Sequence, residues 1–400
     1  PTSTPNSPYV SINVTGGSGS KINLGGYFGS ASGLDRLGVH NDEQIRGLNI
    51  TLFANSSNNS ISSINAGILA GSVTSSSMNS TNMQGSDIYG HLKIASGVTV
   101  NTLNAGGLIG SMTASANLSY SNANSVNFEV VASSISGDYS ILSDLNRNNF
   151  TRNEVGVYSY GTVTSRVNVG NANVGGLVGY LEGSAFTVNG LSVNNQAMNI
   201  SDQRDGTRNI SNGYSFRLNA TGSVNTGSIA GYVGSSSTLR ISGTVQTATY
   251  FDVFSTNASD NSTNIGGAVG NIDNATSVAI GDGSNGYLYS GAAFVSAKHI
   301  NYGGTVGYSN NSSLLSVTRN LTAGVLKVYG SNSEGGTVNA GGFIGNINAG
   351  STTLSGNVAI GDVFIEYDDS SMQNEVNNPS SLQTLSIYYF GGLIGVINTD

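Results

Sequence analysis

A seven-residue motif that returns nine times along the chain constrains the fold more than any other feature of the sequence. Its form is Asn-x-Gly-Gly, then two mostly apolar residues and a closing Gly, as in NAGGLIG at 104–110. The closing Gly is present in all nine copies and the Asn in eight, because the last copy has Tyr389 instead. Repetition of this kind is typical of folds in which each unit packs only on its neighbours. The copies span 23–29, 65–71, 104–110, 173–179, 225–231, 264–270, 301–307, 339–345 and 389–395.

The spacing of the copies indicates one structural unit per motif. Most steps are 37–42 residues long, and the longer ones contain extra polar segments at 137–154, 201–214 and 368–383. We expect these segments to be loops inserted at turns, where added length costs little entropy.

Between the motifs the sequence alternates with period two, which predicts strands, as in SVNFEVV (125–131) and VFIEY (363–367). No window shows a helical stripe with caps. We therefore predict an all-β fold, an elongated parallel β-solenoid of about nine repeats over 23–400, with 1–22 as a linker or edge strand. The sequence leaves open whether each repeat forms one wide coil or two narrow ones. The pentapeptide VAIGD, at 278–282 and again at 358–362, indicates a duplicated strand after a turn of altered length.

The repeated Asn predicts a ladder of side-chain amides. Equivalent residues in stacked windings lie about 4.8 Å apart, so amides can hydrogen-bond from winding to winding. A turn preference of Asn is the alternative, but Asn is only 51 of 400 residues, and eight of nine copies have it. The predicted inward-facing ladder consists of Asn23, Asn65, Asn104, Asn173, Asn225, Asn264, Asn301 and Asn339.

The glycines have separate predicted roles. We expect the Gly pair to supply positive φ angles at a corner, and the closing Gly to let the backbone bend or approach a neighbouring face closely. A phosphate-binding loop is not supported, because no strand–Gly loop–helix context surrounds any copy.

The motif resembles the GLUG-type repeat family, through GGLIG (106–110 and 391–395), GGLVG (175–179) and GGFIG (341–345). GILAG (67–71) and GSIAG (227–231) depart from it. The family occurs in large secreted and cell-surface proteins of bacteria and some protists, often adhesin-like. The resemblance implies an extracellular or cell-surface location and no catalytic residues.

Composition excludes several classes. Charged residues make up 9% of the chain without basic runs, so a nucleic-acid partner is not expected. No apolar stretch reaches the roughly 18–20 residues that span a bilayer. The absence of Cys leaves the compartment open.

Few residues are candidates for catalysis or metal binding, and no cofactor is expected. The histidines His40, His91 and His299 are far apart in sequence. DGSNG (282–286) starts like a calcium loop, but Ala293 stands where the bidentate Glu is required. A β-helix polysaccharide-degrading enzyme would need paired carboxylates. The candidate pairs are Asp42/Glu43, Asp202/Asp205 and Asp368/Asp369.

Two other side-chain sets bear on the surface. The tyrosine pairs Tyr287/Tyr289 and Tyr388/Tyr389 could stack on sugars or pack between strands. Sixteen sequons are possible glycosylation sites, and none is a ladder position. They are Asn13, Asn49, Asn55, Asn58, Asn79, Asn117, Asn149, Asn199, Asn209, Asn219, Asn257, Asn261, Asn274, Asn310, Asn311 and Asn320.

The sequence favours an extracellular structural protein, a surface fibre or adhesin stalk, and not an enzyme. A carbohydrate- or host-binding adhesin that uses the inserted loops is the alternative, and a polysaccharide-degrading enzyme is a third class. A solenoid has an open edge at each end. We expect either that the protein continues or that copies meet end to end, with YVSINVTGG (9–17) adding as a strand.

Overall fold

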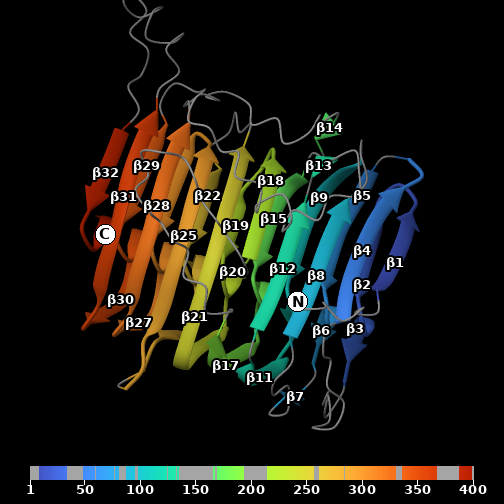
Figure 1. Cartoon of the computed structure of the whole chain (residues 1–400), viewed down its shortest axis with the longest axis horizontal. Helices are drawn as coiled ribbons and strands as arrows, with labels where there is room; N and C mark the ends of the chain where they lie inside the picture. Colours follow the sequence, from blue (N-terminus) through green and yellow to red (C-terminus); the bar gives the residue numbers. More distant parts are fainter. Residues whose placement is uncertain are drawn as a thin grey trace, which may run out of the picture.

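The chain winds repeatedly around one axis, and successive windings lie side by side along the molecule (Figure 1). The computed structural model describes residues 9–33, 48–58, 60–75, 77–80, 87–94, 98–123, 125–131, 133–134, 165–166, 169–192, 214–255, 261–282, 284–329, 336–366 and 387–398. These residues form strands and no helix, and 31 of the strands belong to one hydrogen-bonded array in which all pairings are parallel. The predicted parallel β-solenoid is confirmed.

Equivalent strands of the windings form four stacks. The first stack holds the strands that contain the motif Asn, and the second holds the strands that follow the glycine corner. The first stack is β2 (Ser20–Gly25), β5 (Ser60–Gly67), β9 (Thr99–Gly106), β15 (Val169–Gly175), β19 (Val224–Gly227), β22 (Ser262–Gly266), β26 (His299–Gly303), β29 (Thr337–Gly341) and β32 (Ile387–Gly391). The second is β3 (Phe28–Ser32), β6 (Ala70–Thr74), β10 (Ile109–Thr113), β16 (Val178–Leu181), β20 (Ala230–Val233), β23 (Val269–Asp273), the starts of β27 (Val306–Thr318) and β30 (Ile344–Ser355), and β33 (Ile394–Asn398).

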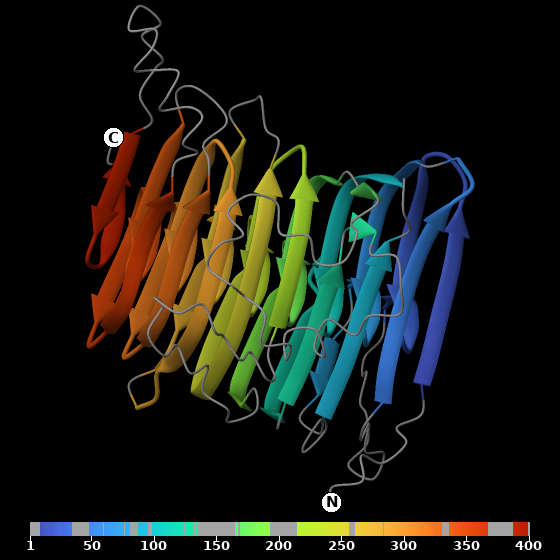
Figure 2. The same cartoon turned by 45° about the horizontal axis from the view of Figure 1, so that its top comes forward.

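The third and fourth stacks close each winding. The third is β7 (Ser77–Ser80), β11 (Asn117–Ala123), β17 (Ala185–Ser192), the start of β21 (Thr238–Ser255), β24 (Ser277–Ile280) and the ends of β27 and β30. The fourth is β1 (Tyr9–Gly16), β4 (Leu48–Ser56), β8 (Asp87–Ile94), β12 (Ser125–Val131), β18 (Tyr214–Ala220), the end of β21, β25 (Tyr287–Ser296), β28 (Leu321–Tyr329) and β31 (Val358–Glu366). Separately, β13 (Ser133–Ser134) and β14 (Ser165–Arg166) form a short antiparallel pair. Figure 2 shows the stacks running from the N-terminal to the C-terminal end.

Each repeat forms one coil. Asn104 pairs with Asn65 on one side and with Asn173 on the other, so adjacent motif copies are always adjacent windings. This holds across steps of 69 and 52 residues, at Asn173 and Asn225. The inserted segments 137–154, 201–214 and 368–383 lie outside the described residues apart from Tyr214, and the pairing of the windings on either side of them is unchanged.

One hydrophobic core runs along the axis inside the windings, from Ile22 to Ile347. Alternate residues of each strand supply it, as in β18, where Tyr214, Phe216, Leu218 and Ala220 are buried. Aromatic rings form part of it, and Phe216 and Phe251 of paired strands have ring centroids 5.8 Å apart. The first stack is buried on both faces over much of its length.

The corner glycines act by a different mechanism from the predicted one. None of the nine first glycines or their following residues has a positive φ among the described residues, so that prediction is wrong. The first Gly is instead required sterically. A Cβ there would lie 1.7–2.5 Å from the carbonyl oxygen three residues later, for example 2.1 Å from Ile109 O at Gly106. The corner is folded so tightly that only hydrogen fits inside it.

The closing Gly permits a close backbone approach, as the sequence predicts. From the second copy to the ninth, a Cβ would lie 2.3–2.8 Å from a backbone nitrogen in the preceding winding. That nitrogen always belongs to the residue after the motif Asn, for example Ala66 at Gly110 and Val174 at Gly231. The second stack therefore lies directly against the backbone of the first, and no side chain separates them there.

Two details of the sequence interpretation concern strand placement. The VAIGD copies are not equivalent strands, because Val278–Ile280 belong to β24 in the third stack and Val358–Asp362 to β31 in the fourth. The duplicated-strand interpretation is therefore wrong. In segment 1–22, β1 pairs in parallel with β4 and so forms the first strand of the fourth stack.

We predict that Gly231→Ala destabilises the protein strongly. Its Cβ would meet Val174 N at 2.4 Å and Gly179 O at 2.7 Å, both backbone atoms that cannot rotate away. The free energy of unfolding should fall by about 1–3 kcal/mol or more, as for overpacked interiors. Thermal unfolding followed by circular dichroism measures the change.

Gly392→Ala is the matched control, because nothing lies within 4 Å of a Cβ there. Its melting temperature should stay close to that of the unmodified protein. Equal stability of the two variants would contradict the close-approach explanation.

Candidate functional site

The motif asparagines form a continuous ladder of side-chain hydrogen bonds. In each step, the Nδ2 of one Asn donates to the Oδ1 of the equivalent Asn in the preceding winding, at 2.7–2.9 Å. The ladder joins Asn23, Asn65, Asn104, Asn173, Asn225, Asn264, Asn301 and Asn339. All eight residues of the predicted ladder thus take part in it, and all bonds point in the same direction.

Burial of the ladder increases from Asn23 to Asn264, and Asn301 and Asn339 beyond it are also buried. Asn23 is exposed, Asn65 and Asn104 are half-buried, and Asn264 has only 1% of its surface exposed. The second stack covers the ladder, and Asn346 Nδ2 of β30 donates to Asn301 Oδ1 at 3.3 Å. The residue after each Asn points to the other face of the strand. The ladder therefore lies between the strands before and after the glycine corner.

The ladder ends where Tyr389 takes the place of Asn. Tyr389 pairs with Asn339, and no described residue gives the buried Oδ1 of Asn339 a hydrogen bond. One end group of the ladder, the acceptor Oδ1 of Asn339, therefore faces the C-terminal edge of the stack. The other end group, the donor Nδ2 of Asn23, faces the N-terminal edge.

The histidines and acids predicted as candidates are not brought together among the described residues. His91 lies in β8 and His299 in β26, several windings apart, and His299 Nδ1 lies 2.9 Å from Thr337 Oγ1. His40 and the three acid pairs lie outside the described residues. No group of three or more His, Asp or Glu side chains in the described part could hold a metal ion.

Asp282 of DGSNG closes a turn. Its Oδ1 accepts hydrogen bonds from the backbone nitrogens of Ser284 and Asn285, at 2.7 and 2.6 Å, and its Oδ2 accepts one from Gly243 N at 3.1 Å. The backbone amides of Asn285, Gly243 and Ser284 lower the pKa of this carboxyl. Both oxygens are therefore already used by the backbone.

The sequons differ in accessibility. Asn320 has 1% of its surface exposed, and its Oδ1 accepts a hydrogen bond from Tyr287 N at 2.9 Å, so a glycan there is incompatible with the fold. The exposed sequons are Asn13, Asn58, Asn117, Asn274 and Asn311, and the half-buried ones are Asn55, Asn261 and Asn310. Asn49, Asn79 and Asn219 lie in β4, β7 and β18. Asn149, Asn199, Asn209 and Asn257 lie outside the described residues.

The tyrosines of the first pair and Tyr389 of the second have opposite environments. Tyr287 and Tyr289 are buried in the core, which favours packing over sugar binding. Burial raises the pKa of both phenols and of Tyr302. Tyr389 is exposed at the C-terminal edge.

The sequence did not predict a strip of tyrosines and carboxylates on the second stack, formed by Tyr180, Tyr232, Glu182 and Asp273. Tyr180 and Tyr232 are stacked with ring centroids 5.1 Å apart and 5° between the ring planes. Tyr180 Oη donates to Glu182, and Tyr232 Oη donates to Asp273 Oδ2 at 3.2 Å. Burial and these acids raise the pKa of both phenols. The sequence feature that could have predicted the strip is the residue after the closing Gly. It is Tyr after the copies at 173–179 and 225–231.

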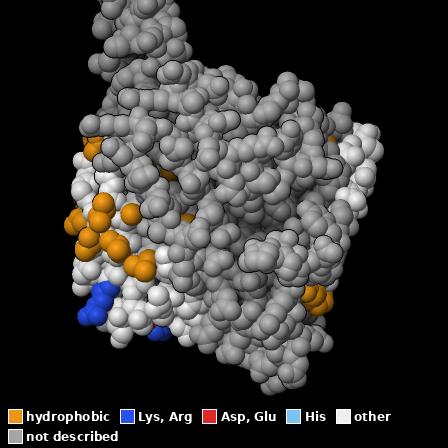
Figure 3. Space-filling view, in the orientation of Figure 1, with side chains coloured by type: hydrophobic (Ala, Val, Ile, Leu, Met, Phe, Trp, Pro, Cys, Tyr) orange, Lys and Arg blue, Asp and Glu red, His pale blue; other side chains and the backbone are white. Residues whose placement is uncertain are grey.

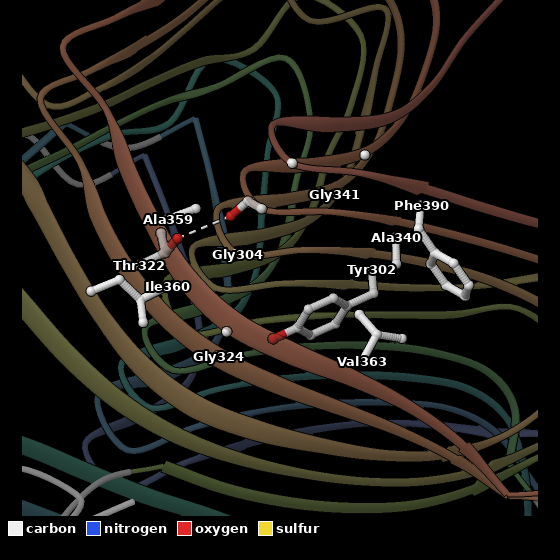
Figure 4. Close-up of a pocket in the computed structure, with 14 residues that line it drawn as sticks. Tyr302, Gly304, Thr322, Gly324, Ala340, Gly341, Ala359, Ile360, Val363 and Phe390 are labelled. Atoms are coloured by element: carbon white, nitrogen blue, oxygen red, sulfur yellow. Dashed lines mark hydrogen bonds between the residues drawn. The ribbon is translucent and has the colours of Figure 1, made fainter.

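The C-terminal edge contains a cavity of about 300 Å³ (Figure 4). Equivalent positions of the fourth stack become smaller toward this end, from Tyr289 to Thr322 to Ala359. Thr322 Oγ1 donates to Gly342 O at 2.9 Å, and Tyr302 points toward Gly324 across the space. The side chains of the walls are otherwise largely apolar, and many of the lining residues are glycines.

Comparisons with known proteins give no relative. No protein-family model matches the chain, and no curated protein and no solved structure matches it. The likeness to GLUG-type repeats therefore stays a prediction. Within the part of the chain that the structure describes, no helix has the length and hydropathy needed to cross a membrane.

We predict that Asn264→Ala breaks the ladder. It leaves Asn225 Oδ1 and Asn301 Nδ2 without their partners in a buried site, at about 1–3 kcal/mol for each unsatisfied group. The melting temperature should fall clearly, whereas Asn348→Ala, which loses one exposed amide bond to Asn310 at a residue without a positive φ, should hardly change it.

Asn264→Asp should make the stability of the protein depend on pH, which a simple packing defect at this position would not do. At neutral pH its carboxylate faces the Oδ1 of Asn225, while a protonated carboxyl can donate to that oxygen. Burial raises the folded pKa of the new Asp above its unfolded value near 3.9. The variant should therefore recover stability as pH falls through the raised pKa, and a pH-independent deficit would contradict the ladder.

The buried tyrosines predict loss of stability in alkali. Tyr287, Tyr289 and Tyr302 have raised pKa values in the fold, so their contribution is complete below the unfolded pKa of about 10 and is lost as pH rises above it. Calorimetry from pH 8 upward should show a falling melting temperature beyond that point. Titration of all 19 tyrosines in the still-folded protein would contradict this.

Proposed function

We propose that this protein is a structural component of an extracellular surface fibre or adhesin stalk. The observation that carries the proposal is the uninterrupted asparagine ladder through eight windings. The eight windings that contain the motif Asn are tied to one another by the same backbone and side-chain bonds, so this part of the rod resists separation of its windings. Stability then needs neither disulfides nor dense charge, which suits a chain with no Cys and 9% charged residues.

A rod of this kind separates its ends, which is what a stalk requires. The first described strand, β1, and the last ones, β32 and β33, lie at opposite ends of the stack (Figures 1 and 2). The windings on either side of the inserted segments pair as the others do, so in this proposal the segments can vary in length without weakening the rod. In this proposal the inserted segments 137–154, 201–214 and 368–383 are attached to a rigid scaffold. They lie outside the described residues, apart from Tyr214.

The test is immunogold labelling and negative-stain microscopy of the source cells. The expected result is label on the outer surface, along rods or fibres that a strain lacking the protein does not display. Label confined to the cell interior, or on compact particles only, would contradict the proposal.

A second candidate, carbohydrate binding, is favoured by the tyrosine–carboxylate strip. Half-buried rings beside Glu182 and Asp273 combine an apolar surface with hydrogen-bond acceptors, as sugar sites do. On a glycan array, Tyr232→Ala should then lose binding, while Tyr287→Phe, a change in the core, should retain it. Equal binding by both variants would exclude the strip.

A further inference from the structure

The stacked rings of Tyr180 and Tyr232 lie on neighbouring windings in the middle of the described stack. They are paired residues of β16 and β20, with ring centroids 5.1 Å apart and 5° between the ring planes. Both side chains are half-buried. In the same column, Ser111 precedes the pair and Asn271 follows it. Two phenol rings are therefore held together, as an isolated couple in their column, where solvent reaches them.

Each phenol of the pair donates its proton to a carboxylate of its own. Tyr180 Oη donates to Glu182, and Tyr232 Oη donates to Asp273 Oδ2 at 3.2 Å. Burial and these acids raise the pKa of both phenols, so each ring is neutral and must release its proton when it loses an electron. A base that takes up a proton must lie within hydrogen-bond reach of it. Glu182 and Asp273 meet this requirement.

We propose that Tyr180 and Tyr232 form an oxidative cross-linking site, at which a dityrosine bond joins two windings. The oxidant is hydrogen peroxide, acting through a haem peroxidase. The inference goes beyond the proposed function and does not depend on it, because it uses only the geometry of this pair.

The reaction balances as the removal of two hydrogen atoms from the pair. Each phenol gives one electron to the peroxidase and one proton to its carboxylate, and becomes a neutral phenoxyl radical. The rings tilt until two Cε atoms meet, and the radicals couple through a new carbon–carbon bond. The hydrogen on each coupled carbon then moves to the oxygen of its own ring, which restores two phenols. One hydrogen peroxide is reduced to two water molecules.

A link at this place constrains the fold in the way that a disulfide would, in a chain that has no Cys. It joins residues 52 apart, on either side of the inserted segment 201–214. In the chain-entropy account, a cross-link that closes a long loop restricts the unfolded chain and so stabilises the folded one. The linked protein should therefore melt at a higher temperature.

Other tyrosines of the described part are less suited to a link within one molecule. Tyr287, Tyr289 and Tyr302 are buried in the core, away from the oxidant. Figure 3 shows exposed apolar side chains near the C-terminal end of the described stack, and Tyr389 is exposed there. Its partner in the preceding winding is Asn339, so no tyrosine lies next to it in that column.

The test treats the purified 400-residue chain with a haem peroxidase and hydrogen peroxide at low protein concentration. The product is then unfolded and digested with trypsin. Tyr180 is the single tyrosine of peptide 167–204, and Tyr232 is the single tyrosine of peptide 218–240. Mass spectrometry of the monomer fraction should find these two peptides joined, with a mass two hydrogen atoms below their sum. Calorimetry of the same fraction before digestion should show a raised melting temperature.

Three variants separate the pair from its surroundings. Tyr180→Phe should abolish the joined peptide. Tyr308→Phe is the matched control and should keep the full yield, because Asn271 separates it from the pair in the same column. Glu182→Gln keeps a hydrogen-bond acceptor but loses the base, so the yield should fall several-fold. An unchanged yield in Glu182→Gln would contradict the proton transfer.

Two results would overturn the inference. One is the absence of the joined peptide while free tyrosine in the same mixture is converted to dityrosine. The other is a link found only in covalent dimers, with a yield that rises with protein concentration. Neither result changes the surface labelling of the source cells, so failure of the cross-link is distinguishable from failure of the proposed function.

Discussion

A buried side-chain amide needs partners on two sides, and a stack of identical amides supplies both to every member except the first and the last. In this protein each Nδ2 donates to the Oδ1 of the preceding winding at 2.7–2.9 Å. A buried polar group without such a partner costs about 1–3 kcal/mol. A winding that slipped by one residue would turn its Asn to the other face and break two rungs. The ladder therefore fixes the register of the eight windings that contain it, including those separated by insertions before Asn173 and Asn225.

The glycines make the ladder possible by bringing two strands together. The first Gly lets the chain fold back within one corner, and the closing Gly lets the next strand lie against the backbone beside the ladder. The Asn side chains are thereby covered by protein on the face where water would otherwise compete for them. Each Asn of the ladder depends on the Asn of the next winding, so the two end residues lack one ladder partner each. Asn23 is exposed, and the Oδ1 of Asn339 has no hydrogen bond among the described residues.

Much of this architecture could be predicted from the motif, because a strict period sets which residues stack. The strand class, the parallel pairing and the eight ladder residues followed from spacing and side-chain type. The role of the corner glycines could not be predicted, because a positive φ and steric crowding both require Gly. Only the coordinates show that crowding is the reason here. The two VAIGD copies look equivalent in sequence, yet β24 and β31 belong to different stacks, since insertions change where in a winding a segment falls. The Tyr180–Tyr232 strip depends on two windings 52 residues apart becoming neighbours.

The most direct test of the ladder is nuclear magnetic resonance on protein labelled selectively at asparagine. Through-hydrogen-bond couplings should connect the Nδ2 of Asn264 with the Cγ of Asn225, and the Nδ2 of Asn301 with the Cγ of Asn264. The same side-chain protons should exchange with deuterated water far more slowly than those of exposed Asn274. Absent couplings together with exchange as fast as at Asn274 would contradict the account, because the amides would then be bonded to water.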